Sequence, residues 1–206
     1  MNKSAGLENM NFFRRNILKL AAAGLMAVLA APAFFTASTA AAATSGGEKV
    51  LTVYYSRTGN TRALAEAIRS GAGGDILELE TVEAYPEDYR ATTDQAKKEL
   101  AENYFPPLKN GEIDIAQYDV IFVGSPSWWG TFAPAIRGFL AQHDFSGKKI
   151  VPFITHGGSG LGNSIADLKT LSPGATVLEG LAIRGNRVNS AQGEVTKWLK
   201  DHGLGK

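Results

Sequence analysis

The sequence contains no cysteine, only three histidines and almost no net charge, and each shortage removes a class of function. Without cysteine there can be no disulfide, zinc–thiolate site, iron–sulfur cluster or cysteine nucleophile. The three histidines, His143, His156 and His202, are too scattered to predict a metal-binding cluster. A formal charge of +1 over 206 residues gives no basic field of the kind that binds nucleic acid. Any redox chemistry must therefore come from a bound organic cofactor.

The charges are unevenly distributed along the chain. Residues 1–45 carry four basic residues and one acid, whereas the remainder carries 17 basic and 19 acidic residues, a charge of −2. The early segment has a basic stretch containing Arg14-Arg15, an alanine-rich apolar run over residues 18–35 and a small-residue stretch over residues 36–43. This order is typical of an export signal, and the arginine pair is typical of the twin-arginine type.

A membrane anchor is the alternative interpretation of the same segment. The apolar run is about 18 residues long, the lower limit for spanning a bilayer, and Pro32 interrupts it. Cleavage sites of the Ala-x-Ala kind follow immediately, which favours removal of the segment. We therefore predict a signal peptide over residues 1–43 and one domain over residues 44–206, located in the periplasm, with membrane attachment only if the signal is retained.

From residue 49 onward, short apolar runs alternate with helical patterns. The pattern predicts strands over residues 50–55, 75–80, 118–123, 149–154 and 175–183, and helices over residues 63–68, 92–104, 135–142, 164–171 and 190–202. Most of the strands are apolar at both parities, as expected where both faces of a sheet are covered. The expected fold is one α/β domain with an open, doubly wound, five-stranded parallel sheet and helices on both faces. Pro152 is awkward in the middle of the fourth strand.

In such sheets, ligands bind beyond the carboxyl ends of the strands, so the loops after the strands are the candidate sites. The first loop, residues 56–61, holds three hydroxyls, an asparagine and one glycine just before a helix. This composition suits a phosphate bound by neutral donors and the helix N-terminus. A simple helix cap is the alternative, but it needs only one of these side chains. The loop lacks the Walker and Gly-x-Gly-x-x-Gly patterns, so a monophosphate is favoured over a dinucleotide.

The loops after the third and fourth strands are also unusual. Residues 124–131 contain Trp128 and Trp129 side by side, and adjacent residues rarely share one packing direction, so we expect one indole in the core and one on a flat ligand. Gly130 would allow the backbone to approach that ligand. Residues 155–162 are rich in glycine, which suits backbone donors at a ring edge. A serine hydrolase is excluded because Leu161 replaces the final glycine of Gly-x-Ser-x-Gly around Ser159.

Taken together, Ser-x-Thr-Gly-Asn-Thr, Gly-x-Pro-x-Trp-Trp-Gly and Thr-x-Gly-Gly-Ser-Gly resemble the flavodoxin family over residues 49–206. The resemblance implies strand order 2-1-3-4-5 and one non-covalent FMN. It assigns the phosphate to the first loop, the isoalloxazine flanks to the second, with the Gly130 carbonyl facing flavin N5, and the pyrimidine side to the third. The residues so implied are Ser56, Arg57, Thr58, Gly59, Asn60 and Thr61; Pro126, Ser127, Trp128, Trp129 and Gly130; and Thr155, His156, Gly157, Gly158, Ser159 and Gly160.

Two departures from that family bear on function. Many flavodoxins are strongly acidic and carry a stacking tyrosine in the third loop, whereas this domain is near neutral and has His156 there. Tyr85 is a candidate for the second ring stacker, with simple packing as its alternative. An acidic docking surface and a very low potential are therefore not expected.

The resemblance identifies the cofactor better than the reaction. We expect an FMN protein that transfers electrons outside the cytoplasm, with an unidentified redox protein as partner. The alternative is an FMN-dependent NAD(P)H or quinone reductase, for which Arg57, Arg62, Arg184 and Arg187 could supply the charge that nucleotide phosphates need. A third interpretation is a flavin-binding module without redox function.

Overall fold

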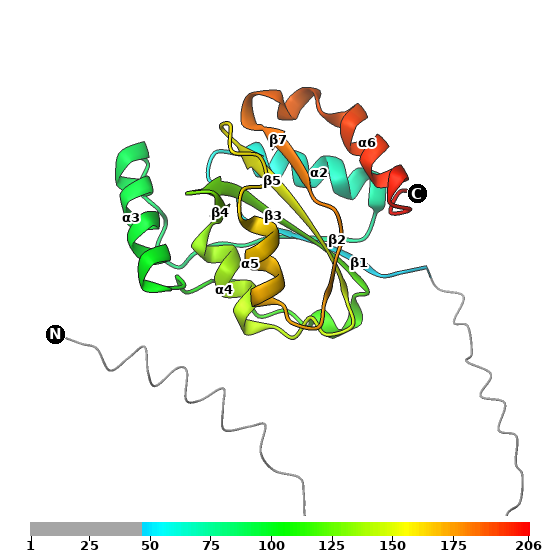
Figure 1. The fold of residues 1–206 in the computed structure, drawn as a ribbon, viewed down its shortest axis with the longest axis horizontal. Coiled ribbons are helices and arrows are strands. Elements are labelled where there is room, and N and C mark those ends of the chain that lie inside the picture. The colour runs from blue at the N-terminus through cyan, green and yellow to red at the C-terminus, as the bar shows by residue number, and fades with distance from the viewer. Residues whose placement is uncertain (1–46) are drawn as a thin grey trace, which may run out of the picture. The chain divides into compact units, whose positions relative to one another are not determined.

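The computed structural model describes residues 47–206, in which a parallel β-sheet carries helices on both faces (Figure 1). The predictions for the export signal over residues 1–43 lie outside this range. The parallel strands run in the order β2-β1-β3-β5, and β6 and β7 both pair with β5 at its outer edge. This is the 2-1-3-4-5 order expected from the family resemblance. The strands are β1 (Val50–Tyr54), β2 (Asp75–Glu78), β3 (Val120–Trp128), β4 (Thr131–Phe132), β5 (Lys149–His156), β6 (Thr176–Val177) and β7 (Leu181–Arg184).

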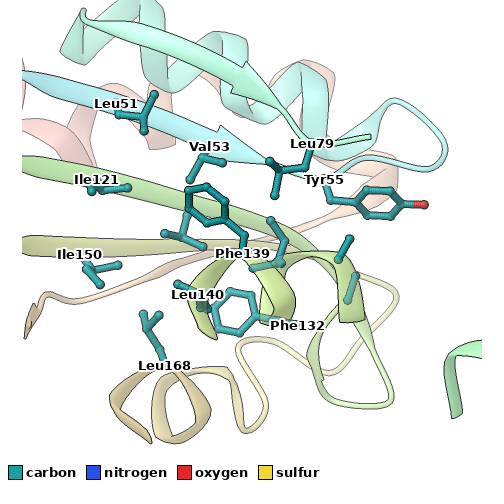
Figure 2. Close-up of a cluster of buried hydrophobic side chains, with 14 of the residues drawn as sticks. Leu51, Val53, Tyr55, Leu79, Ile121, Phe132, Phe139, Leu140, Ile150 and Leu168 are labelled. Carbon is teal, nitrogen blue, oxygen red and sulfur yellow. The ribbon is translucent and has the colours of Figure 1, made fainter. Parts of the chain in front are cut away.

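The helices form two layers, with α2 and α6 on one face of the sheet and α4 and α5 on the other (Figure 1). Alternate side chains of the central strands point into two hydrophobic cores, one on each face of the sheet. Leu51 and Val53 of β1 face α4, as Figure 2 shows, whereas Tyr54 packs on the side of α2 and α6. This confirms the two-sided burial predicted from the apolar runs. The helices are α2 (Asn60–Ala72), α3 (Tyr89–Glu102), α4 (Pro134–Gln142), α5 (Ser164–Leu171) and α6 (Gln192–Asp201), with short 3₁₀ turns η1 (Ile115–Gln117) and η2 (Gly185–Ser190).

Helix α3 stands at the side of the sheet and is buried only through Thr92, Ala96 and Glu99 (Figure 1). It begins at Tyr89, three residues before the predicted start, because the Asp88 side chain caps it by accepting from the Ala91 N–H at 2.8 Å. It ends where Asn103 adopts a left-handed conformation. The earlier start brings the first turn of α3 to the ends of the central strands.

The last predicted strand is interrupted, which explains the proline inside β5. Residues 176–177 and 181–184 form separate strands, and between them β5 has no partner on that side. The carbonyl of Ile150 accepts from Leu178 on this side, so Pro152, two residues later, would direct its missing N–H into the gap. The proline therefore removes no hydrogen bond from the sheet.

Strand β3 runs further than predicted and turns back on itself. The segment 124–128, expected as loop, continues the strand, and β4 then pairs antiparallel with its end. The two central residues of the hairpin, Trp129 and Gly130, both have positive φ, 54° and 79°. A two-residue hairpin of this kind matches the twist of its strands, but a tryptophan in the left-handed region is uncommon. The second candidate loop is thus a rigid hairpin.

Candidate functional site

A cleft of about 910 Å³ lies at the carboxyl ends of the central strands, where the strand order reverses. Its walls come from the three loops predicted from the sequence, from the first turns of α3, and from the junction of β7 with η2. The lining residues are Arg57, Thr58, Asn60, Thr61, Tyr89, Arg90, Thr92, Thr93, Asp94, Pro126, Ser127, Trp128, Trp129, Thr155, His156, Gly157, Arg184, Gly185 and Asn186. Its volume is near the upper end for a small-molecule pocket, about 300–1,000 Å³.

The first loop presents unsatisfied backbone donors to this cleft. Gly59 precedes α2 with φ 87°, a left-handed conformation, and gives the helix no side-chain cap. Within residues 47–206, no protein atom accepts a hydrogen bond from the backbone N–H groups of residues 58–61. The Ser56 hydroxyl oxygen accepts a hydrogen bond from the backbone N–H of Arg62, in the first turn of α2, at 3.2 Å. The Ser56 hydroxyl thus provides the cap that one alternative required, while the N–H groups left free at the positive end of the helix form a geometry suited to an anion.

The loop is tied to the third candidate loop by a buried pair of hydroxyls. Thr61 Oγ1 lies 2.8 Å from Thr155 Oγ1, and both side chains are almost fully buried. This contact holds the start of α2 against the end of β5. The donors are therefore positioned by the sheet before any ligand binds.

The two arginines of the first loop and the adjoining helix are directed elsewhere. Arg57 Nη2 donates to the carbonyls of Pro86, at 3.3 Å, and Glu87. Arg62 makes a bidentate pair with Glu78, at 2.7 and 2.8 Å. The charge of Arg62 is thus paired with Glu78, and Arg57, which lines the cleft, directs its Nη2 to two carbonyls. The free donors at residues 58–61 are neutral backbone N–H groups.

The two tryptophans take different positions, although both line the cleft. Trp128 is half-buried and meets Tyr55 and Tyr85 edge-on, with ring centroids 5.6 and 4.8 Å apart. Trp129 is 55% exposed at the cleft, and its indole N–H donates to the Thr93 carbonyl at 2.9 Å. The Lys97 ammonium lies 5.0 Å from the Trp129 ring centre. Helix α3 thus holds the indole of Trp129 in place.

Tyr85 belongs to the core, so of its two interpretations the structure supports packing. It is 8% exposed, and its hydroxyl donates to Glu99 at 2.5 Å. Burial and this bond raise the pKa of Tyr85 far above its usual range. The aromatic side chain that lines the cleft from this part of the chain is Tyr89, which is 73% exposed.

The third loop is braced against the hairpin. The Gly130 carbonyl accepts from the Asn163 N–H at 2.7 Å, and Ser127 and Ser159 hydroxyls lie 2.8 Å apart. Gly130 does not line the cleft, and the lone pair that its carbonyl shares with Asn163 is unavailable to flavin N5 in this conformation.

His156 is the cleft residue whose protonation is closest to neutral pH. Its Nδ1 accepts from the Gly160 N–H at 3.1 Å, which places the proton of the neutral ring on Nε2. Partial burial, and secondarily the charge of Arg184, lower the pKa of His156. The neutral ring is therefore favoured at pH 7.

The structure brings eleven of the predicted site residues together on the cleft surface. The predicted residues that do not line the cleft are Ser56, Gly59, Gly130, Gly158, Ser159 and Gly160. The sequence interpretation missed two sets: Tyr89, Arg90, Thr92, Thr93 and Asp94 on α3, and Gly185 and Asn186 after β7, next to Arg184, which it had named only as a possible charge for nucleotide phosphates. The second set could have been found, because it also follows the carboxyl end of a strand. The first could not, since nothing local indicates that α3 reaches the cleft.

Comparison with known proteins agrees with this geometry. A family described as Flavodoxin matches residues 49–202, which is most of the chain. The chain belongs to the flavodoxin family. Its fold is similar to that of a putative flavoprotein from Bacteroides uniformis, 28% identical, with a TM-score of 0.67 over 75% of this chain and 99% of that one. It is also similar to a Lactobacillus acidophilus flavoprotein solved in complex with FMN, 28% identical, with a TM-score of 0.59 over 69% of this chain and 97% of that one.

Curated relatives of this flavodoxin-family chain match over a shorter stretch. A Cupriavidus metallidurans protein named NAD(P)H dehydrogenase (quinone) is 35% identical over 94 residues, 46% of each chain. The chain spans about half the length of the curated relatives it matches. Among residues 47–206, no helix is long and apolar enough to cross a membrane, and no group of three or more possible ligands forms a metal site.

Proposed function

We propose that this chain binds FMN in the cleft and uses it in electron transfer. The observation that supports this proposal most directly concerns the free N–H groups at residues 58–61. These groups lie at the same cleft as the exposed ring of Trp129. A phosphate at one end and a flat ring at the other are the two features of FMN that a protein must bind. Membership of the flavodoxin family and similarity to a flavoprotein solved with FMN support the same ligand.

The residues present fit this cofactor. Thr58, Asn60 and Thr61 bind the phosphate together with the backbone donors of the first loop, because no other acceptor in the described range uses those donors. Trp129 covers one face of the ring, held by its bond to Thr93. The third loop closes the pyrimidine side through backbone donors and His156, whose Nε2–H is available as a donor.

Bound FMN supplies the electron or hydride transfer that no side chain of this cysteine-free protein can perform. The chain contributes position and environment. The Thr61–Thr155 pair and the rigid hairpin preorganise the two ends of the cleft, so little conformational entropy is lost on binding. Trp128, Tyr55 and Tyr85 form an apolar backing behind the ring site.

A reductase acting on NAD(P)H and a quinone is the second candidate. It is supported by the name of the Cupriavidus relative and by the outer wall of the cleft, where Tyr89 and Arg90 lie exposed beside the ring site. An aromatic ring next to a guanidinium suits a second flat, anionic ligand. Of the four arginines named from the sequence, Arg57 and Arg184 line the cleft, whereas Arg62 and Arg187 are paired with Glu78 and Glu194 outside it.

Titration with FMN tests the proposed cofactor, and turnover then separates the two candidates. The purified domain should quench FMN fluorescence with saturable, one-to-one stoichiometry. Steady oxidation of NADPH or NADH with a quinone acceptor would favour the reductase. A flavin-loaded protein that exchanges electrons with a redox protein but shows no such turnover would favour the carrier. A protein that takes up no FMN would refute both.

We further propose that a twin-arginine signal exports the chain to the periplasm, with cleavage within residues 40–44. The proposal rests on the basic, apolar and small-residue order of residues 1–43. Changing Arg14-Arg15 to Lys-Lys should retain the precursor inside the cell, as detected by fractionation and the mass of the chain. Normal export of that variant would refute the twin-arginine type, and an uncleaved chain in the membrane fraction would indicate an anchor.

A further inference from the structure

The seven arginines of residues 47–206 fall into two groups, according to whether the guanidinium has a partner within this range. Five of the seven donate to an acceptor in this range: Arg57, Arg62, Arg69, Arg137 and Arg187. The guanidinium groups of the other two, Arg90 and Arg184, have no hydrogen-bond or ion-pair partner among the described residues, and both residues line the cleft. An unpaired guanidinium inside a binding cleft is suited to an anionic group of a ligand.

Arg184 is the one of these two that adjoins the first loop. It ends β7 opposite His156 of β5, and Gly185 follows it against the side chain of Asn60. A Cβ atom added at Gly185 would lie 2.7 Å from Asn60 Nδ2, so the backbone after Arg184 touches the N-terminus of α2. A Cβ at Gly158 would lie 3.7 Å from Arg184 Nη2, which places the guanidinium over the third loop. Arg184 therefore stands between the first loop and the third loop.

The guanidinium groups of the first loop and of the start of α2 are already engaged by other acceptors. Arg57 is held by the Pro86 and Glu87 carbonyls, and Arg62 by Glu78. A phosphate monoester carries a charge of about −1.5 to −2 at pH 7, which neutral donors alone leave uncompensated. The fold brings a cation to the loop from a strand more than 120 residues away.

We propose that Arg184 is the counter-charge for the FMN phosphate and makes the cleft select FMN over riboflavin. This inference rests on the proposed function, since it takes FMN as the ligand. The guanidinium binds phosphate oxygens beside the N–H groups of residues 58–61. Riboflavin, which has the same ring and no phosphate, gains nothing from Arg184. The residue thus sets specificity for the phosphorylated flavin and leaves binding of the ring to Trp129 and the third loop.

The test compares the dissociation constants of FMN and riboflavin for four proteins: the wild type, Arg184→Gln, Arg184→Lys and Arg187→Gln. A charge-assisted hydrogen bond contributes about 1.5–3 kcal/mol, which is roughly 10- to 100-fold in affinity. Because Arg184 is solvent-exposed, we expect the lower end, about tenfold, at 50 mM salt and less at 500 mM. Arg184→Gln should lose this factor for FMN and bind riboflavin as the wild type does. Arg184→Lys should recover part of the loss, because it keeps the charge without the planar fork.

Arg187→Gln is the matched control, since it removes the same charge three residues later, where Arg187 pairs with Glu194 outside the cleft. It should leave both affinities unchanged. Three results would overturn the inference: an unchanged FMN-to-riboflavin ratio in Arg184→Gln, an equal loss for both flavins, or the same loss in Arg187→Gln. Absence of FMN binding by the wild type would instead refute the proposed function itself, so the two failures are distinguishable.

Discussion

At the scale of single residues, the adjacent tryptophans show how the backbone divides two identical side chains between core and site. Trp128 ends a strand and points among Tyr55 and Tyr85. Trp129 sits at the corner of the hairpin with φ 54°, which turns its indole away from the core and toward α3. The left-handed conformation costs about 1 kcal/mol or more, and the bond to Thr93 offsets part of this cost. The residue in the left-handed conformation is the one whose ring is exposed at the cleft.

Substitution by alanine should therefore affect mainly stability at Trp128 and mainly FMN affinity at Trp129. Trp128→Ala leaves a cavity between two tyrosines and should lower the free energy of unfolding by about 3 kcal/mol. Trp129→Ala should cost less than about 1 kcal/mol of stability. It should, however, weaken FMN binding about tenfold or more, because stacking on an aromatic ring contributes about 1–3 kcal/mol. Urea unfolding and FMN fluorescence titration of the two variants measure these effects. Unchanged FMN affinity in Trp129→Ala would mean that its ring does not cover the flavin.

At the scale of elements, the register between β3 and β5 depends on a glycine. Gly124 lies opposite Phe153 on the neighbouring strand, and a Cβ at Gly124 would lie 2.0 Å from the ring. Phe153 is fully buried, so its ring has no space into which to move. The sequence interpretation placed Gly124 at the start of the second candidate loop. In the structure, the missing side chain of Gly124 leaves room for the Phe153 ring.

Gly124→Ala should lower the free energy of unfolding by about 1–3 kcal/mol or more, because it overpacks the core between two central strands. Gly193→Ala serves as its control, since Gly193 lies in α6 with open space around a Cβ and an ordinary φ. That control should be neutral or stabilising by about 0.5–1 kcal/mol. Chemical denaturation of both variants measures the difference. Equal stabilities would show that Phe153 rearranges at no cost.

At the scale of the whole molecule, three buried tyrosines link the sheet to the wall of the cleft. Burial, assisted by Glu78, raises the pKa of Tyr54 to about 12, and burial raises the pKa of Tyr55 to about 12. Tyr85 shifts in the same direction. The folded state therefore keeps these protons at a pH where the unfolded chain, with a tyrosine pKa near 10, releases them. Their contribution to stability is complete below pH 10 and is lost as the pH rises toward 12.

The stability of the domain should accordingly fall between pH 10 and pH 12, by at most about 1.4 kcal/mol per pH unit for each tyrosine. Tyr55→Phe isolates one contribution, because no hydrogen bond of the Tyr55 hydroxyl is present within residues 47–206. Over this range the unfolding free energy of the wild type should fall more steeply with pH than that of the variant, while lysine titration affects both proteins equally. Parallel curves for the two proteins would contradict the assignment.

The architecture and the identity of the three loops were accessible from local patterns. Apolar runs at both parities predicted a sheet covered on both faces, and the polar loop before α2 predicted an anion site. Both predictions depend only on residues that are close together in the sequence. The residues at which strands and helices begin and end were harder to predict from the sequence. The split of the last strand depends on pairing with β5, and the early start of α3 depends on the Asp88 cap.

The residues that complete the cleft depended on contacts between distant parts of the chain. Composition did not distinguish Arg184 from Arg62 or Arg187, since all three are arginines near candidate loops. The partners Glu78 and Glu194 neutralise two of them, and the pairing of β7 with β5 carries the third to the N-terminus of α2. In the same way, a carboxylate at Glu99 holds Tyr85 in the core and leaves Tyr89 at the surface. Chain pattern sets which elements form, because propensity and periodicity are local; burial and charge pairing set which side chains are free to act, because they arise only when the elements pack.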